Sequence, residues 1–109
     1  MSDDTPLVVL CTTPSADVGA ALARKLVEAK LAACVNIVPA MRSIYRWQGE
    51  TKDDAECQLL IKTRSARFAA LEQLIRQHHP YDEPEIIALP ITQGSASYLN
   101  WLRAETELD

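Results

Sequence analysis

The chain is poor in glycine and has none of the glycine-rich loops with which many proteins hold phosphate groups. Only three of its 109 residues are glycine, and neither a G-x-x-x-x-G-K-[ST] nor a G-x-G-x-x-G pattern occurs. The G-x-S-x-G pattern of serine hydrolases is also missing. Because no cofactor motif and no nucleophile–base pair is visible, the sequence predicts a protein that is not an enzyme.

Positive charge and long apolar stretches are also scarce. The net charge of -4 argues against a surface made for nucleic acid or anionic lipid, because such a surface needs clustered Lys and Arg. No stretch approaches the roughly 20 apolar residues that cross a bilayer. The apolar run at 7–11 is too short for a signal sequence. We therefore expect no nucleic acid and no membrane among the partners.

Cysteine is present in an odd number and without a metal-binding or disulfide spacing. The three cysteines, Cys11, Cys34 and Cys57, form no C-x-x-C pair. This usage is typical of a reducing compartment, so we expect a cytoplasmic protein. A length of 109 residues suits one hydrophobic core, so the sequence predicts a single domain over residues 1–109.

The apolar periodicity predicts alternating strands and helices. Strands are expected at 6–13, 34–48 with a bend at Pro39, 55–63 and 85–92, with a hairpin tip at 48–50. Helices are expected at 17–31, from a Ser65 cap onward with Phe68, Leu71, Ile75 and His78 on the inner face, and after Gly94 and Ser95. This order is the βαββαβ arrangement of ferredoxin-like folds with an extra C-terminal helix, so the expected fold class is α+β.

Two features of the expected strands indicate an oligomer. The first strand has apolar residues on both of its faces, whereas a strand in a sheet with one solvent-exposed face should alternate apolar and polar residues. The second extended segment, 34–48, is far longer than the usual five or six residues. A second copy of the chain would cover the free face and pair with the excess strand, so we expect a homo-oligomer.

The two histidines of the chain, His78 and His79, stand side by side immediately before Pro80. In a ferredoxin-like sheet the second helix ends near the C-terminal end of the first strand, where Cys11 lies. Thiolate sulfur and imidazole nitrogen suit copper or zinc better than magnesium or calcium. Cys11, His78 and His79 are therefore the candidate metal ligands.

Other interpretations of these three residues stay open. A cysteine in an apolar strand is normally a neutral thiol and a poor ligand. Adjacent residues on a helix point in different directions, so the two rings converge only if the backbone unwinds before Pro80. His78 also extends the apolar stripe of its helix, which predicts a side chain packed at the edge of the core.

Two further clusters carry polar and aromatic groups. Residues 81–85 contain Tyr81 and acidic side chains, which suit acid–base chemistry, a hard metal ion or simply a solvated turn. The Tyr45-Arg46-Trp47 cluster beside the hairpin tip suits nucleobase stacking or a subunit interface. Since the chain is acidic, the interface is the better interpretation.

Several segments, in their order and spacing, together resemble the CutA family of divalent-cation tolerance proteins. They read VVLCT, KLAACVNIVP, SIYRWQGE, LIKT, HHPY, PEI, LPI and YLNWL. The resemblance implies a ferredoxin-like homotrimer, similar to PII-type signalling proteins, with a role in tolerance to copper and other heavy metals. It also implies copper as the bound ion, with zinc as the second choice, and Cys11, His78 and His79 as its ligands. Glu83 departs from the small apolar residue common in the family.

A different class of function stays open beside this one. In it the chain is a PII-like regulatory trimer that binds a small metabolite or a partner protein in clefts between subunits. Tyr81, Glu83, Glu85 and Arg46 would then line the cleft, and metal affinity would be incidental.

Overall fold

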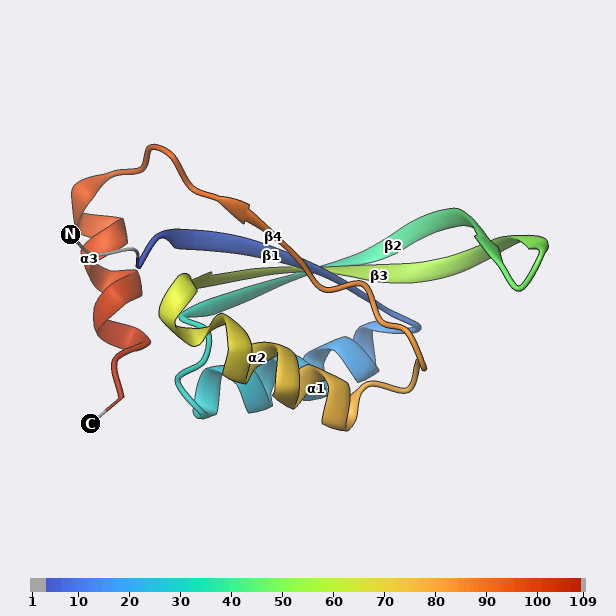
Figure 1. Cartoon of the computed structure of the whole chain (residues 1–109), viewed down its shortest axis with the longest axis horizontal. Helices are drawn as coiled ribbons and strands as arrows, with labels where there is room; N and C mark the ends of the chain where they lie inside the picture. The colour runs from blue at the N-terminus through green and yellow to red at the C-terminus, as the bar shows by residue number, and fades with distance from the viewer. Residues whose placement is uncertain (1–3, 109) are drawn as a thin grey trace.

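The computed structural model describes residues 4–108 as a sheet with helices packed against it (Figure 1). In chain order the elements are β1 (Pro6–Thr13), α1 (Ala16–Glu28), β2 (Cys34–Trp47), β3 (Glu50–Arg64), α2 (Ser65–His78), β4 (Ile87–Pro90) and α3 (Ala96–Glu105). The sheet order is β2-β3-β1-β4, and all neighbouring strands are antiparallel. The expected α+β class is therefore confirmed.

The central strand, β1, is paired on both sides. It pairs with β3 along its whole length and with β4 between Leu7 and Leu10. β4 is shorter than the expected segment 85–92. Pro84 precedes it and Pro90 is its last residue, and because proline has no N–H to donate, the ladder does not extend far past them.

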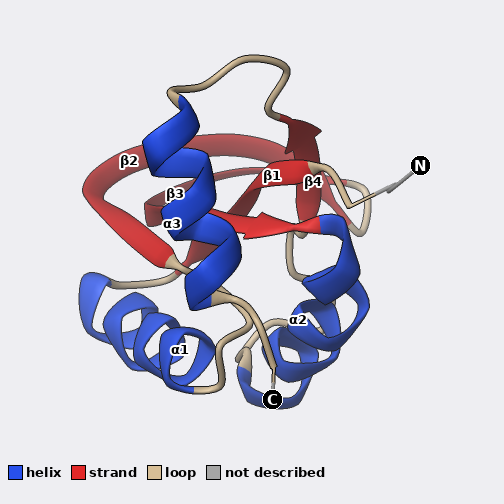
Figure 2. Cartoon of the chain, turned by 90° about the vertical axis from the view of Figure 1, so that its left-hand side faces the viewer, coloured by secondary structure: helices blue, strands red, loops and turns tan. Residues whose placement is uncertain are grey.

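The hydrophobic core lies between one face of the sheet and the pair of helices α1 and α2. Figure 2 shows these two helices side by side beneath the sheet, with α3 standing across one end of it. The sheet contributes Val9, Cys11, Leu59 and Ile61 to this core, and the helices contribute Leu22, Leu26, Leu71 and Ile75. Fully burying one such aliphatic side chain stabilises the fold by about 1.5–3 kcal/mol, so this layer holds the scaffold together.

Helix α1 ends earlier than its apolar pattern suggested. Ser15 caps its start by accepting a hydrogen bond from the N–H of Val18 at 3.2 Å. At the other end Lys30 has a left-handed φ of 60°, and the N–H of Leu31 bonds to the carbonyl of Leu26. This Schellman closure stops the helix at Glu28 instead of the expected residue 31, although Leu31 still reaches the core.

The hairpin of β2 and β3 projects beyond the rest of the sheet. Its outer part, residues 42–55, pairs only with itself, because the pairing of β3 with β1 begins at Cys57. We call residues 42–55 the arm; Figure 1 shows it extending from the body of the molecule. A register shift between Val38 and Met41 confirms the bend expected at Pro39. The return strand starts at Glu50 rather than at the expected residue 55, because cross-strand pairing continues to the turn.

The turn of the arm has the two-residue form that its sequence predicts. Trp47 pairs with Glu50, and between them Gln48 and Gly49 have φ values of 51° and 82°. Positive φ at both central residues is what a type I′ hairpin requires, and glycine adopts it without steric cost. The expected hairpin tip at 48–50 is thus confirmed.

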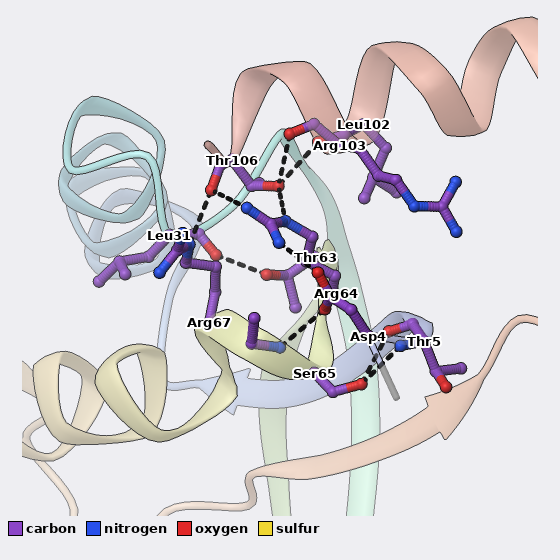
Figure 3. A network of polar contacts seen from close by, with 11 residues as sticks. Asp4, Thr5, Leu31, Thr63, Arg64, Ser65, Arg67, Leu102, Arg103 and Thr106 are labelled. Carbon is purple, nitrogen blue, oxygen red and sulfur yellow. Dashed lines mark hydrogen bonds and ion pairs between the residues drawn. The ribbon is translucent and has the colours of Figure 1, made fainter. Parts of the chain in front are cut away.

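The start of α2 is stabilised by the N-terminal segment and not by Ser65. Ser65 is the first helical residue, and its hydroxyl bonds to the backbone of Thr5. The exposed N–H of Ala66 instead donates to the carboxylate of Asp4 at 2.9 Å. The prediction that Ser65 caps the helix was therefore wrong, because a carboxylate distant in sequence takes that place (Figure 3).

Both ends of the described chain meet at one buried arginine. The guanidinium of Arg64 donates from Nε to the hydroxyl of Thr106 at 2.7 Å and from Nη2 to its carbonyl at 2.8 Å. It also forms an ion pair with Asp4. Burial raises the pKa of Asp4, but the bonds from the Ala66 N–H and from Arg64 outweigh it, so this pKa lies below its ordinary value.

The sheet face opposite α1 and α2 keeps large apolar side chains in solvent. Because Val8 and Leu10 alternate with the core residue Val9, their cross-strand partners Leu89 and Ile87 share this outer face. Ile87 and Leu89 are 52% and 51% exposed. The apolar first strand therefore has only one of its faces covered by α1 and α2. No helix within residues 4–108 is long and apolar enough to cross a membrane.

Candidate functional site

The chain leaves helical geometry at His79, immediately before Pro80. Helix α2 ends at His78, and His79 has an extended backbone with ψ of 137°. Proline disfavours helical geometry in the residue that precedes it, so this ending follows from the sequence. The backbone unwinding that the paired histidines would need is thus present.

The imidazole of His79 is buried and both of its nitrogens are used. Nδ1 accepts a hydrogen bond from the N–H of Tyr81 at 3.1 Å, so Nε2 carries the proton. Nε2 donates it to the carbonyl oxygen of Thr12 at 2.7 Å. The ring therefore ties the end of α2 to the end of β1, where the topology placed it. A metal ion could use either nitrogen only by replacing one of these bonds.

His78 lies elsewhere. Its side chain is exposed, whereas the apolar stripe of α2 continues from Ile75 to His79, four residues further on. The prediction that His78 packs on the inner face was therefore wrong. The two rings do not share one environment.

Cys11 is fully buried among the core residues of β1. Burial, together with the negative charge of Glu85, raises the pKa of its thiol to about 12. A neutral buried thiol is a poor ligand for copper or zinc.

The three candidate ligands therefore do not fit a metal ion as they stand in the single chain. Within residues 4–108, no group of three or more His, Cys, Asp or Glu side chains is placed to hold one ion. Ligation by Cys11, His78 and His79 would need the thiol to ionise and the ring of His79 to release a bond. It stays a prediction.

A hollow of the described surface lies where the arm meets the residues after α2. We call residues 80–85 the corner. The cleft has a volume of about 710 Å³. Its lining residues are Thr12 of β1, Met41, Ser43, Ile44, Tyr45 and Trp47 of β2, Glu56 and Gln58 of β3, and Pro80, Tyr81, Asp82, Glu83 and Glu85 of the corner. A pocket of this size is in the range that holds small organic ligands.

One hydrogen bond joins the two sides of this cleft. The hydroxyl of Tyr81 donates to Oε2 of Glu56 at 2.6 Å, and Glu56 is only 9% exposed. Burial and this bond raise the pKa of Tyr81 above its ordinary range, so its hydroxyl stays protonated. The ring of Tyr81 also lies 4.7 Å from that of His79. The corner is thus held from both sides.

Sequence reasoning found part of this cleft. It named Tyr81, Glu83 and Glu85, which do line it, and it named Arg46, which does not. Arg46 lies between two lining residues, Tyr45 and Trp47, but is not itself part of the lining. It missed Glu56, because alternation with the apolar Cys57 marked Glu56 only as a residue of the outer face.

Comparison with known proteins gives a consistent answer. A family model described as CutA1 divalent ion tolerance protein matches residues 7–105. A curated protein of Thermus thermophilus, named divalent-cation tolerance protein CutA, is 54% identical over 99 residues, which are 91% of this chain and 96% of that protein.

Solved structures agree with the sequence match. A structure described as the divalent cation tolerance protein Cut A1 of Thermus thermophilus has a TM-score of 0.91 and 52% identity, and the match covers 94% of this chain and 99% of that one. A structure from Archaeoglobus fulgidus, described as a periplasmic divalent cation tolerance protein CutA, has a TM-score of 0.91 and 34% identity, with coverage of 94% and 99%.

Proposed function

Because the chain belongs to the CutA1 divalent ion tolerance family, we propose that it takes part in the tolerance of its host to divalent metal ions. The observation that carries this proposal is the family match over residues 7–105 together with close relatives that bear this name. Copper is the ion we put first, and the protein acts by binding rather than by catalysis.

A growth assay tests the role in tolerance. A host strain that lacks the gene is grown in graded concentrations of Cu(II), Zn(II) and, as a control, Mg(II). We expect greater sensitivity to Cu(II) than in the parent, no change with Mg(II), and restoration by the gene on a plasmid. Equal growth of the deletion strain and the parent at every concentration would refute the role.

A titration tests the metal ligands separately. Calorimetry of the purified protein with Cu(II) compares the wild type with the triple replacement of Cys11, His78 and His79 by alanine. Binding that is equally tight in both would remove these residues as ligands while leaving the tolerance role intact. The buried state of Cys11 and His79 predicts slow binding, since the site has to open first.

We further infer that the working form is a homotrimer with ferredoxin-like subunits. The support is the exposed apolar face of Ile87 and Leu89, the element order, and an arm whose apolar residue Ile44 is 67% exposed. Burial contributes about 25 cal/mol for each Å² of apolar surface, so covering this face with a second copy of the chain stabilises the assembly. Sedimentation at micromolar concentration is the test, and a folded monomer of 12.1 kDa would refute the oligomer.

The cleft favours a second candidate, a regulatory trimer that binds a small ligand. The specific observation is the 710 Å³ hollow that gathers Tyr81, Glu83 and Glu85. A ligand stabilises the state that it binds, so a thermal-shift screen separates the two functions. Stabilisation by organic molecules but not by copper would favour the regulatory role.

We propose the cytoplasm as the location, because three cysteines without a disulfide or metal-binding spacing are typical of a reducing compartment. The relative from Archaeoglobus fulgidus, by contrast, is described as periplasmic. Fractionation of the native host with an antibody against this chain decides it. Recovery from the periplasm would contradict our proposal.

A further inference from the structure

The cleft between the arm and the corner has charge of one sign only. Four of its lining residues are carboxylates, namely Glu56, Asp82, Glu83 and Glu85, and none is Lys, Arg or His. Three aromatic residues, Tyr45, Trp47 and Tyr81, share the lining. Aromatic faces carry partial negative charge and attract cations. Walls of this kind therefore attract a positive charge and repel a negative one.

Glu56 is the residue that most needs a positive partner. It is 9% exposed, and its one hydrogen bond comes from the hydroxyl of Tyr81 to Oε2. No cationic side chain within residues 4–108 forms an ion pair with it. A carboxylate removed from water without a counter-charge is costly to the fold, so a cation in the cleft would stabilise it.

The second oxygen of this carboxylate is open to the cleft. Oε1 of Glu56 has no hydrogen bond within the described chain. Every side-chain nitrogen or oxygen that is buried in this part of the chain does have a hydrogen-bond partner. Oε1 is therefore not sealed in the interior. Since Glu56 lines the cleft, a bound molecule can reach this oxygen.

The acidic groups are not arranged for a bare metal ion. No three of them come together closely enough to hold one ion within residues 4–108. Glu83 is moreover engaged by Arg76 at 3.4 Å on the α2 side. Charge that is spread around a hollow with aromatic walls suits a larger cation with an apolar body.

We propose that this cleft binds an organic ammonium ion, a small molecule with a protonated amine on an apolar skeleton. The amine bonds to Oε1 of Glu56, and the skeleton lies against the rings of Tyr45 and Trp47. This proposal names the ligand class for the second candidate function and rests on it, and it does not depend on the role in metal tolerance.

Calorimetry on the full chain with putrescine as the probe tests the proposal. The matched probe is the uncharged diol of the same chain length. We expect saturable binding of putrescine, no binding of the diol, and a loss of roughly tenfold or more in affinity for Glu56→Gln. Glutamine keeps an acceptor for Tyr81, so this variant retains the fold. Glu28→Gln on the exposed surface of α1 is the control and leaves the affinity unchanged.

A second variant, Trp47→Leu, removes one aromatic wall without touching Glu56. A loss of a few-fold in affinity is expected. Equal binding of diol and diamine, or a Glu56→Gln variant with wild-type affinity, would overturn the proposal. So would failure of putrescine to bind while Glu56→Gln loosens the oligomer, because the cation would then be a side chain of a second copy. Growth of the Glu56→Gln strain in Cu(II) reports on metal tolerance independently.

Discussion

The Nε2 atom of His79 donates a hydrogen bond to the carbonyl oxygen of Thr12 at 2.7 Å, and this contact fixes the end of α2 against the end of β1. The neighbouring His78 makes no such contact and is exposed. The two adjacent imidazoles, which look equivalent in the sequence, thus have different roles. His79 positions the corner, which in turn supplies part of the cleft wall.

The first prediction compares the two histidines. We expect His79→Ala to lower the free energy of unfolding by about 2–3 kcal/mol, because it leaves a void and deprives Thr12 of its partner. His78→Ala should change it by no more than about 0.5 kcal/mol, as is usual for an exposed residue. Urea unfolding at one protein concentration measures both. Equal effects of the two replacements would contradict the assignment of His79 as the structural histidine.

The second prediction concerns the buried ion pair that joins the ends of the chain. Arg64→Met keeps an unbranched apolar stem but removes the guanidinium, so Asp4 loses this cation and Thr106 loses the two donors that Arg64 supplies. Removing one partner of a buried pair costs about 3–5 kcal/mol, so we expect a large fall in the midpoint of urea unfolding.

The control for this variant is Arg42→Met. Arg42 pairs with Asp53 through two hydrogen bonds at 2.8 and 2.6 Å, but its side chain is 76% exposed. Solvent screens such a pair, so we expect little change in stability. A loss for Arg42→Met as large as that for Arg64→Met would show that burial does not set the strength of these pairs.

Acid should act on the same contact. The folded pKa of Asp4 is lowered, so the unfolded state binds more protons as the pH falls through the ordinary value of 3.8. The contribution of Asp4 is therefore complete above that value and is lost as the pH falls through the lower folded pKa. Unfolding of the wild type and Asp4→Asn between pH 2 and 6 should converge at the acid end. A difference in the free energy of unfolding between the two proteins that stays constant over this pH range would contradict the lowered pKa of Asp4.

The third prediction uses the end of α1. Lys30 has a left-handed φ of 60°, which costs a residue with a Cβ about 1–2 kcal/mol and glycine almost nothing. Lys30→Gly should therefore stabilise the protein by about 1 kcal/mol. Ala29→Gly is the matched control, since Ala29 has an ordinary φ of -82°. There glycine only adds freedom to the unfolded chain, and we expect a loss of about 0.5–1 kcal/mol. Thermal unfolding of the two variants and the wild type measures whether each replacement raises or lowers the stability.

Features that depend on neighbouring residues were visible in the sequence. The bend at Pro39, the turn at Gln48-Gly49 and the start of the last helix after Ser95 all follow from the backbone preferences of a few adjacent residues. These signals located the strands and helices and hence the α+β class.

Features that join distant segments were not visible. The cap of Asp4 on Ala66 spans 62 residues, and the bond from Tyr81 to Glu56 spans 25. No local pattern marks either partner, because each becomes a partner only when the strands are in register. The same reason explains why the pair of histidines suggested one metal site. Their adjacency is local, whereas their different burial is set by where Pro80 ends the helix.

The last prediction concerns the thiol of Cys11. Its pKa is raised from 9.0 to about 12 by burial and by the charge of Glu85. In the unfolded chain the thiol ionises near its ordinary value, whereas in the folded protein it stays protonated. Above pH 9 the unfolded state therefore binds fewer protons, and stability falls by up to about 1.4 kcal/mol for each pH unit. Cys11→Ala removes this term, so its stability relative to the wild type should rise between pH 9 and 11.

Alkylation gives a second measurement on the same residue. At pH 8 a small iodoacetamide pulse followed by mass spectrometry should leave Cys11 unmodified, because a protonated and fully buried thiol is neither nucleophilic nor accessible. Cys57 is also buried, whereas Cys34 is only half-buried and is the first candidate for reaction. The copper prediction makes the opposite demand on Cys11, since a ligand has to be a reachable thiolate. Rapid modification of Cys11 in the native protein, with a stability difference from Cys11→Ala that does not vary with pH, would contradict the buried neutral thiol and reopen Cys11 as a metal ligand.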